Sequence, residues 1–250
     1  MTLKCPPKWM LVSNIMFIAC LVFAADPPNQ SCQFGVMVGG KGRVLQLVDI
    51  VKDIGATCVR INCRLKDNDH NLARFFEAGI DVILTFSNND PSNIDTKYGA
   101  PNEWPNAGFP FKSKTVYQQR VREVLIPLRP FLASGRKAWA QCENEIGDAA
   151  INPKSRYWRG TTEQYLAQIQ AFREAVESIS PSIPVVLTSF PSESLSALIE
   201  PDNRHHEYAE RHLAKLLMSP NYSVVDLHFY GSVEDIPAKV KAIKARMPTD

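Results

Sequence analysis

Apolar and polar positions along the chain follow two alternating patterns from Ser31 onward. Short apolar runs rich in β-branched residues, typical of buried strands, occupy residues 32–38, 57–63, 81–87, 137–143, 183–189 and 223–229. Longer segments with a helical period cover residues 44–55, 70–79, 115–135, 161–180, 203–219 and 234–247. This alternation predicts βα units built on a parallel sheet.

The segment 161–180 carries the clearest helical pattern. Its apolar face is formed by Tyr165, Ile169, Phe172, Val176 and Ile179, which are spaced by four and three residues. Thr161 followed by Gln164 forms a capping box, in which each side chain bonds to the other residue's backbone N–H. The pattern therefore also marks where this helix begins.

Six βα units leave two α/β architectures open, an open doubly wound sheet and a (β/α)8 barrel of the TIM type with about six of its eight units. The stretch "GVMVGGKG" after residue 34 lacks the glycine spacing of a dinucleotide site, which disfavours the first. Polar side chains gather at the carboxyl ends of the strands, where barrel enzymes place their active sites: Arg60, Asn62, Asn88, Asn89, Asn144, Glu145, Ser189, His228 and Tyr230. The TIM-barrel fold is therefore our prediction.

Two loops at the same ends of the strands are rich in aromatic residues. The loop of residues 88–113, called the aromatic loop below, holds Tyr98, Trp104, Phe109 and Phe111, and the loop after the fourth strand holds Tyr157 and Trp158. Flat aromatic rings bind the apolar faces of sugars, so these loops indicate carbohydrate binding. The alternative is that the rings only pack the loops onto the barrel.

The first 24 residues resemble a signal peptide. Lys4 and Lys8 precede the apolar run "MLVSNIMFIACLVFA", and Val22 and Ala24 supply small residues before a cleavage site. We therefore expect a secreted or periplasmic protein, with residues 25–250 forming a single, incomplete barrel domain. A lipid anchor at Cys20 and an uncleaved N-terminal anchor are less favoured alternatives.

Charge and cysteines limit the possible partners and cofactors. Residues 25–250 contain 26 basic and 26 acidic side chains and no basic cluster, so we expect a neutral carbohydrate substrate and no nucleic acid partner. The cysteines of this region, Cys32, Cys58, Cys63 and Cys142, have no metal-binding spacing. Buried thiols and one disulfide both remain open, and no metal or cofactor is expected.

Two short motifs carry a family resemblance. The stretches "ENE" (143–145) and "HFY" (228–230) resemble motifs at the ends of strands four and six in the retaining glycoside hydrolases of the cellulase-like barrel superfamily (clan A), such as families 5 and 39. The resemblance implies that Glu145 is the general acid/base and that Asn144 binds the 2-hydroxyl of the sugar. It also implies that Arg60, His228 and Tyr230 border the nucleophile.

The chemistry of this class requires two carboxyl groups about 5 Å apart, one to protonate the leaving oxygen and one to attack the anomeric carbon. Glu145 fits the first role, and we expect burial to raise its pKa. Structural roles are possible for the neighbouring residues. Arg60 could form a salt bridge at the end of a strand, His228 could be a hydrogen-bonded core residue, and Glu143 could form an ion pair facing a helix.

The chain also departs from the family pattern. The nucleophile of the family is a Glu at the end of strand seven, whereas this sequence ends at "KAIKARMPTD", so we expect a C-terminally truncated fragment without it. Glu193 and Glu234 are poor substitutes, because both lie where helices are expected to begin. Ile146 follows the Asn–Glu pair where relatives have proline, and Asn88 stands where many relatives have histidine.

The sequence therefore predicts a secreted glycoside hydrolase that cleaves a β-linked poly- or oligosaccharide with retention, represented by part of its barrel. The expected substrate-binding residues are Arg60, Asn144, His228, Tyr230, Asn88, Trp104 and Trp158. The main alternative is a barrel that binds carbohydrate without cleaving it. An exported barrel enzyme of another class is disfavoured, because the chain lacks GxSxG and HExxH motifs.

Overall fold

A computed structural model describes residues 35–38, 44–65, 72–97, 99–146 and 157–248. Six parallel strands form one sheet in the order β1-β2-β3-β4-β5-β6. Their bounds are β1 Gly35–Val38, β2 Cys58–Arg64, β3 Asp81–Ser87, β4 Ala138–Cys142, β5 Val185–Pro191 and β6 Val224–His228. Each strand pairs with its neighbours in the sequence, whereas a doubly wound sheet reverses its strand order.

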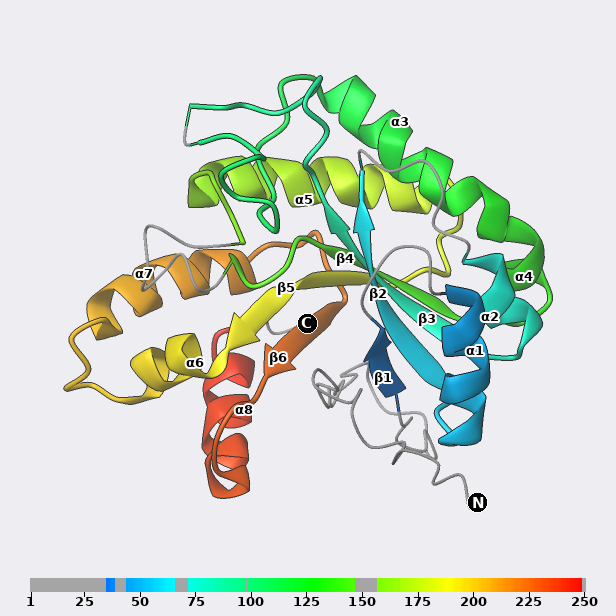
Figure 1. Ribbon diagram of the computed structural model, residues 1–250. Helices are drawn as coiled ribbons and strands as arrows, with labels where there is room; N and C mark the ends of the chain where they lie inside the picture. The colour runs from blue at the N-terminus through cyan, green and yellow to red at the C-terminus, as the bar shows by residue number, and fades with distance from the viewer. Residues whose placement is uncertain (1–34, 39–43, 66–71, 98, 147–156, 249–250) are drawn as a thin grey trace, which may run out of the picture.

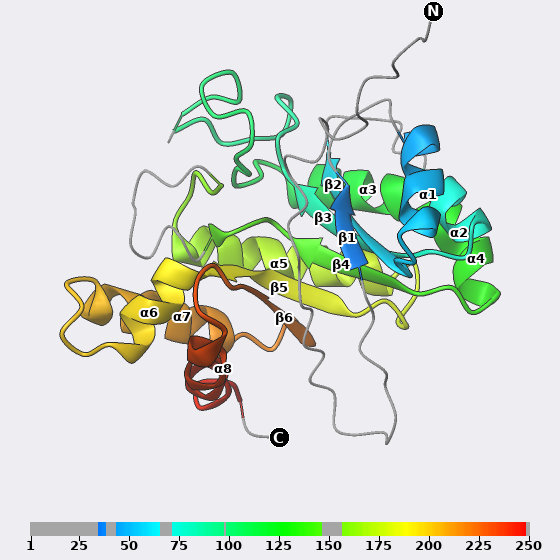
Figure 2. The same ribbon diagram turned by 60° about the horizontal axis from the view of Figure 1, so that its bottom comes forward.

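The strands curl into an open arc with the helices on its outer side (Figure 1 and Figure 2). This arrangement confirms the predicted fold class, since it corresponds to part of a (β/α)8 barrel. The helices are α1 Val44–Asp53, α2 Ala73–Glu77, α3 Lys114–Leu125, α4 Arg129–Ala133, α5 Thr162–Glu177, α6 Ser192–Ile199, α7 His206–Leu217 and α8 Ile236–Lys244. Two 3-10 turns, Ile126–Leu128 and Val233–Asp235, precede α4 and α8.

The predicted helix 115–135 is divided into α3, a 3-10 turn and α4. Pro127 and Pro130 lie at these junctions, each in the first turn of the new segment. Proline has no backbone N–H to donate, so it is tolerated there but would interrupt a continuous helix. The sequence predicts only a helix start near Glu193, where the structure has the separate helix α6.

The core lies between the sheet and the helices. On α5, Tyr165, Ile169, Phe172 and Val176 are fully buried, as the helical pattern predicts, and the ring of Phe172 meets Phe86 of β3 edge to face at 5.1 Å. Helix α3 runs beside α5 (Figure 1), joined to it by the ion pair between Lys114 and Glu174. These two helices cover the strands that end at the candidate site.

Helix α5 begins at the predicted capping box. The Thr161 hydroxyl accepts a hydrogen bond from the Gln164 backbone N–H, and the Gln164 side chain accepts one from the Thr161 backbone N–H. We expect Thr161→Ala to lower the free energy of unfolding by about 1 kcal/mol, because the cap is lost. Denaturant unfolding measures this, with Gln170→Ala, an exposed change on the same helix, as the control expected to have little effect.

The structure describes three of the four cysteines of residues 25–250, and all three are buried. Cys58, Cys63 and Cys142 lie in strands, and the Cys142 sulfur is 3.7 Å from the Tyr117 hydroxyl. Cys20, Cys32 and the predicted signal peptide of residues 1–24 lie outside the described residues. Within the described ranges, no helix combines the length and the apolar character needed to cross a membrane.

Candidate active site at the carboxyl ends of the strands

A buried arginine on β2 is the centre of the polar site. Arg60 is 3% exposed, and its Nε donates to Thr85 Oγ1 of β3 at 2.8 Å. Its Nη2 donates to Asn144 Oδ1 just after β4 at 2.7 Å, and its Nη1 lies 3.1 Å from Asp226 Oδ2 of β6. Arg60 therefore joins β2, β3, β4 and β6 from inside the arc. Its ion pair with Asp226 is buried there.

Beneath Arg60, polar side chains of four strands form one hydrogen-bonded network. Thr85 Oγ1 donates to Gln141 Oε1 at 2.7 Å, and Gln141 Nε2 donates to Asp226 Oδ2 at 2.8 Å. The Ser189 hydroxyl donates to the same Asp226 oxygen at 2.7 Å. Thr85 and Gln141 are neighbours in the register of β3 and β4, as are Ser189 and Asp226 in β5 and β6.

Asp226 supplies the negative charge that balances Arg60. Its carboxyl group is 5% exposed, and burial alone would raise its pKa. The Arg60 charge and the hydrogen bonds from His228 and Ser189 outweigh burial and hold the pKa well below its ordinary value. Asp226, Gln141 and Thr85 are absent from the predicted site residues, although each is a polar residue inside an apolar strand.

His228, at the end of β6, connects this network to Glu145. Its Nε2 lies 2.6 Å from Arg60 Nη1, and its Nδ1 lies 2.5 Å from Glu145 Oε1. Arginine can only donate, so a neutral ring accepts at Nε2 and carries its proton on Nδ1. A protonated ring keeps this Nδ1 proton and carries a second one on Nε2, which lies 3.2 Å from Asp226 Oδ2. His228 therefore donates to Glu145 in either state and to Asp226 only when it is protonated. Burial lowers the pKa of His228, but its hydrogen bonds to Asp226 and Glu145 outweigh burial and raise it.

Glu145 is held from two sides and is largely buried. The Tyr230 hydroxyl donates to the same Oε1 at 3.4 Å, and Glu145 itself is 8% exposed. Both Glu143 and Glu145 have left-handed backbone conformations, with φ of 63° and 46°. Such conformations are uncommon outside glycine, cost about 1–3 kcal/mol each, and concentrate at functional sites.

Asn144 is oriented by Arg60. Because its Oδ1 accepts from the guanidinium, the amide group that Asn144 can offer to a ligand is Nδ2. The structure thus brings together five of the predicted residues in one connected group: Arg60, Asn144, Glu145, His228 and Tyr230.

Other predicted site residues are placed differently. Asn88 is 1% exposed, and its Nδ2 donates to the Phe109 carbonyl, so it holds the aromatic loop in place. Trp158 is 3% exposed, meets Tyr165 edge to face and donates its indole N–H to the Thr161 carbonyl. This placement leaves the Trp158 ring without an exposed face for a sugar.

Trp104 is a partly exposed aromatic side chain of the loop. It packs against the small cluster of Ile94, Ala107 and Phe109, with the Arg159 guanidinium 4.3 Å from its ring centroid. Phe109 is fully buried and Phe111 stacks on Tyr117, so these rings pack the loop onto the barrel. Tyr98 lies outside the described residues.

The prediction of an ion pair at Glu143 is wrong. Its side chain does face helix α5, but its partner there is the amide of Gln168, and no described cation contacts it. The reason is that the left-handed turn at Glu143 directs the carboxyl group into the layer between sheet and helices, where burial is complete. Glu193 is exposed in the first turn of α6, and Glu234 is exposed in the 3-10 turn that precedes α8. Acidic side chains at such positions interact favourably with the helix dipole, as predicted.

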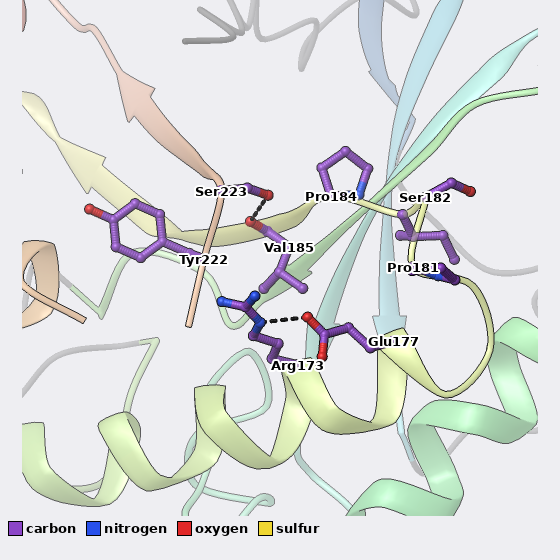
Figure 3. Close-up of a pocket in the computed structure, with 9 residues that line it drawn as sticks. Arg173, Glu177, Pro181, Ser182, Pro184, Val185, Tyr222 and Ser223 are labelled. Carbon is purple, nitrogen blue, oxygen red and sulfur yellow. Dashed lines mark hydrogen bonds and ion pairs between the residues drawn. The ribbon is translucent and has the colours of Figure 1, made fainter. Parts of the chain in front are cut away.

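Among the described residues there is no metal centre, and a pocket in the structure lies apart from this site. Within the described ranges, no three His, Cys, Asp or Glu side chains are grouped to hold a metal ion. A pocket at the amino ends of β5 and β6 (Figure 3) is lined by Arg173, Glu177, Pro181, Ser182, Ile183, Pro184, Val185, Tyr222 and Ser223. It lies at the opposite end of the strands from Glu145, and Arg173 and Glu177 within it form an ion pair with each other.

Comparisons with known proteins identify the fold. No protein-family model and no curated protein sequence matches the chain. Among solved structures, it is similar to an exo-β-1,4-mannosidase from Opitutaceae bacterium strain TAV5, with a TM-score of 0.53, 14% identity, and coverage of 88% of this chain and 45% of that one. It is also similar to a glucosidase from Croceicoccus marinus, with a TM-score of 0.50, 14% identity, and coverage of 80% and 44%.

A third similar structure is Saccharomyces cerevisiae Gas2p in complex with laminaritriose and laminaritetraose, with a TM-score of 0.50 and 14% identity. The alignment covers 86% of this chain and 47% of that one. The chain therefore spans less than half the length of each of these three proteins. At such low identity the likeness establishes the barrel fold that the resemblance predicted, and activity has to be argued from the residues.

Proposed function

We propose that this chain forms the acid/base half of a retaining glycoside hydrolase that acts on a β-linked poly- or oligosaccharide. The observation that carries the proposal is the position of Glu145, a largely buried carboxyl group just after β4 that accepts hydrogen bonds from His228 and Tyr230. Fold similarity to proteins described as a glucosidase and a mannosidase supports the same reading.

The geometry gives each group in the site a role. Oε1 of Glu145 is engaged by His228 and Tyr230, so Oε2 is the oxygen that carries the catalytic proton. Glu145 donates this proton to the leaving oxygen as the bond from that oxygen to the anomeric carbon breaks. Asn144, fixed by Arg60, can donate from Nδ2 to a sugar hydroxyl and so position the ring for proton transfer from Glu145.

The second carboxylate of the mechanism is not Asp226. Its Oδ2 already meets Arg60, Gln141, Ser189 and His228, and Asp226 is only 4% exposed, so it is poorly placed to attack an anomeric carbon. The attacking carboxylate therefore comes from outside this network. The proposal also includes secretion directed by residues 1–24. A carbohydrate is the proposed partner, since residues 25–250 carry no formal net charge, which suits an uncharged substrate.

The test is the stereochemistry of cleavage by the full-length natural gene product. A panel of aryl β-glycosides is incubated with the protein, and proton NMR follows the configuration of the first sugar released. Hydrolysis with retention is expected. Inversion would overturn the two-carboxylate proposal, and oligosaccharide binding without cleavage by the full-length protein would replace it with the carbohydrate-binding alternative.

A further inference from the structure

Glu143 closes β4 with a fully buried carboxyl group that the proposed mechanism does not use. Its Oε1 accepts hydrogen bonds from the Asn88 backbone N–H at 2.8 Å and from Gln168 Nε2 at 2.7 Å. Its Oε2 has no hydrogen-bond partner among the described residues. Through its two hydrogen bonds, Glu143 joins the end of β4 to the start of the aromatic loop at Asn88 and to Gln168 of α5.

The far end of the aromatic loop also rests on this carboxyl group. Gly108 packs so closely against it that a Cβ built there would overlap Glu143 Oε2. Gly108 is the point at which the loop meets the segment after β4, since its N–H donates to the Tyr157 carbonyl and its carbonyl accepts from the Arg159 N–H. Both ends of the loop are joined by the hydrogen bond from Phe109 N–H to the Asn88 carbonyl.

The surroundings favour the uncharged form of Glu143. Burial raises its pKa from 4.5 to about 8, and the hydrogen bonds from Asn88 and Gln168 offset only part of this effect. The ionisable groups facing it are Tyr117 of α3, Tyr165 of α5 and Cys142 of β4, whose own pKa values burial raises. Asn88, Gly108 and Gln168 bring no charge, so no described cation stabilises a carboxylate here.

We propose that Glu143 is a positioning residue that works as a neutral acid: protonated, it fixes the aromatic loop to the end of β4 and so holds Asn144 and Glu145 in place. Asn144 alone separates it from Glu145, and the left-handed backbone at both glutamates makes their relative placement depend on this junction. Loss of the proton puts an unpaired charge under Gly108 and releases the junction. The part that concerns Glu145 rests on the function proposed above.

The experiment compares Glu143→Gln with the unmodified full-length natural gene product between pH 5 and pH 9.5. Glutamine keeps the shape and the acceptor oxygen without a charge. The native state of the unmodified protein holds a proton that the unfolded state loses above its ordinary pKa, so its stability falls relative to the variant as pH rises from 4.5 toward 8. Above that range, kcat/KM of the unmodified protein falls about tenfold further per pH unit relative to kcat/KM of the variant, because ionisation of Glu145 affects both proteins and ionisation of Glu143 only the unmodified one.

Glu103→Gln is the matched control, because Glu103 is an exposed acid on the same loop and its change is expected to leave both pH profiles unaltered. An infrared carbonyl band of a protonated carboxyl at pH 7, absent from Glu143→Gln, reads the protonation state directly. Identical pH profiles for the two proteins, or a Glu143→Gln variant that is unfolded at pH 6, would overturn the proposal. A difference in stability without glycosidase activity would sustain the neutral acid and reject the proposed function instead.

Discussion

Replacing Glu145 by glutamine is expected to lower kcat/KM of the full-length natural gene product by about 10²–10⁴-fold for glycosides with poor leaving groups. Glutamine still accepts from His228 and Tyr230 at the position of Oε1, so the site keeps its shape. It has no proton to transfer to the leaving oxygen. The loss should be much smaller for substrates such as dinitrophenyl glycosides, whose leaving groups depart without protonation.

Steady-state kinetics with a series of aryl glycosides measures this dependence. Glu193→Gln is the control, because Glu193 is exposed in the first turn of α6, where its charge favours the helix and no catalytic role is required. A rate loss of the same size for every leaving group would contradict an acid role for Glu145. A comparable loss in Glu193→Gln would point to a different carboxyl group.

Replacing Asp226 by alanine is expected to lower the free energy of unfolding by about 3–5 kcal/mol at pH 7. The substitution leaves the Arg60 charge buried without its counter-charge, and it removes the acceptor shared by Gln141 and Ser189. Ser189→Ala, which removes one hydroxyl and leaves the ion pair, should cost about 1 kcal/mol. Denaturant unfolding followed by circular dichroism measures both.

The effect of Asp226 should depend on pH in a defined direction. Its pKa is depressed in the folded protein, so its contribution is fully present above the ordinary pKa of 3.8 and is lost as the pH falls below it. The stability difference between the unmodified protein and Asp226→Asn should therefore shrink below about pH 4. A difference that is unchanged at pH 3 would mean that the ion pair with Arg60 contributes little.

The fold could be predicted from the sequence because its strands are mostly apolar and buried. Each of the six predicted strands exists in the structure, with ends within three residues of those expected. Parallel strands covered by helices require such continuous apolar runs, and the glycines at 55, 79 and 135 mark the ends of helical segments. The predicted helix 115–135 is not one unit, because Pro127 and Pro130 interrupt an otherwise helical pattern.

The candidate site was predictable only in part. Asn144, Glu145, His228 and Tyr230 lie at or just beyond the carboxyl ends of β4 and β6, and parallel strands bring such ends together. Arg60 lies within β2 and reaches this group with its long side chain. The placements of Glu143 and Trp158 do not follow from strand order. A left-handed residue reverses the direction of a side chain, and burial of a loop ring depends on the packing of the whole loop. The network beneath Arg60 could have been found as polar residues within four apolar strands.

The role of Glu145 as the acid/base is best tested by chemical rescue of Glu145→Ala in the full-length natural gene product. With a dinitrophenyl β-glycoside, a retaining enzyme without its acid/base accumulates the glycosyl–enzyme ester, and azide can then attack the anomeric carbon and release the enzyme carboxylate. We expect azide to restore turnover and to yield a β-glycosyl azide, identified by NMR. An α-glycosyl azide, or no rescue by azide in a variant that remains folded, would contradict the assignment of Glu145 as the acid/base.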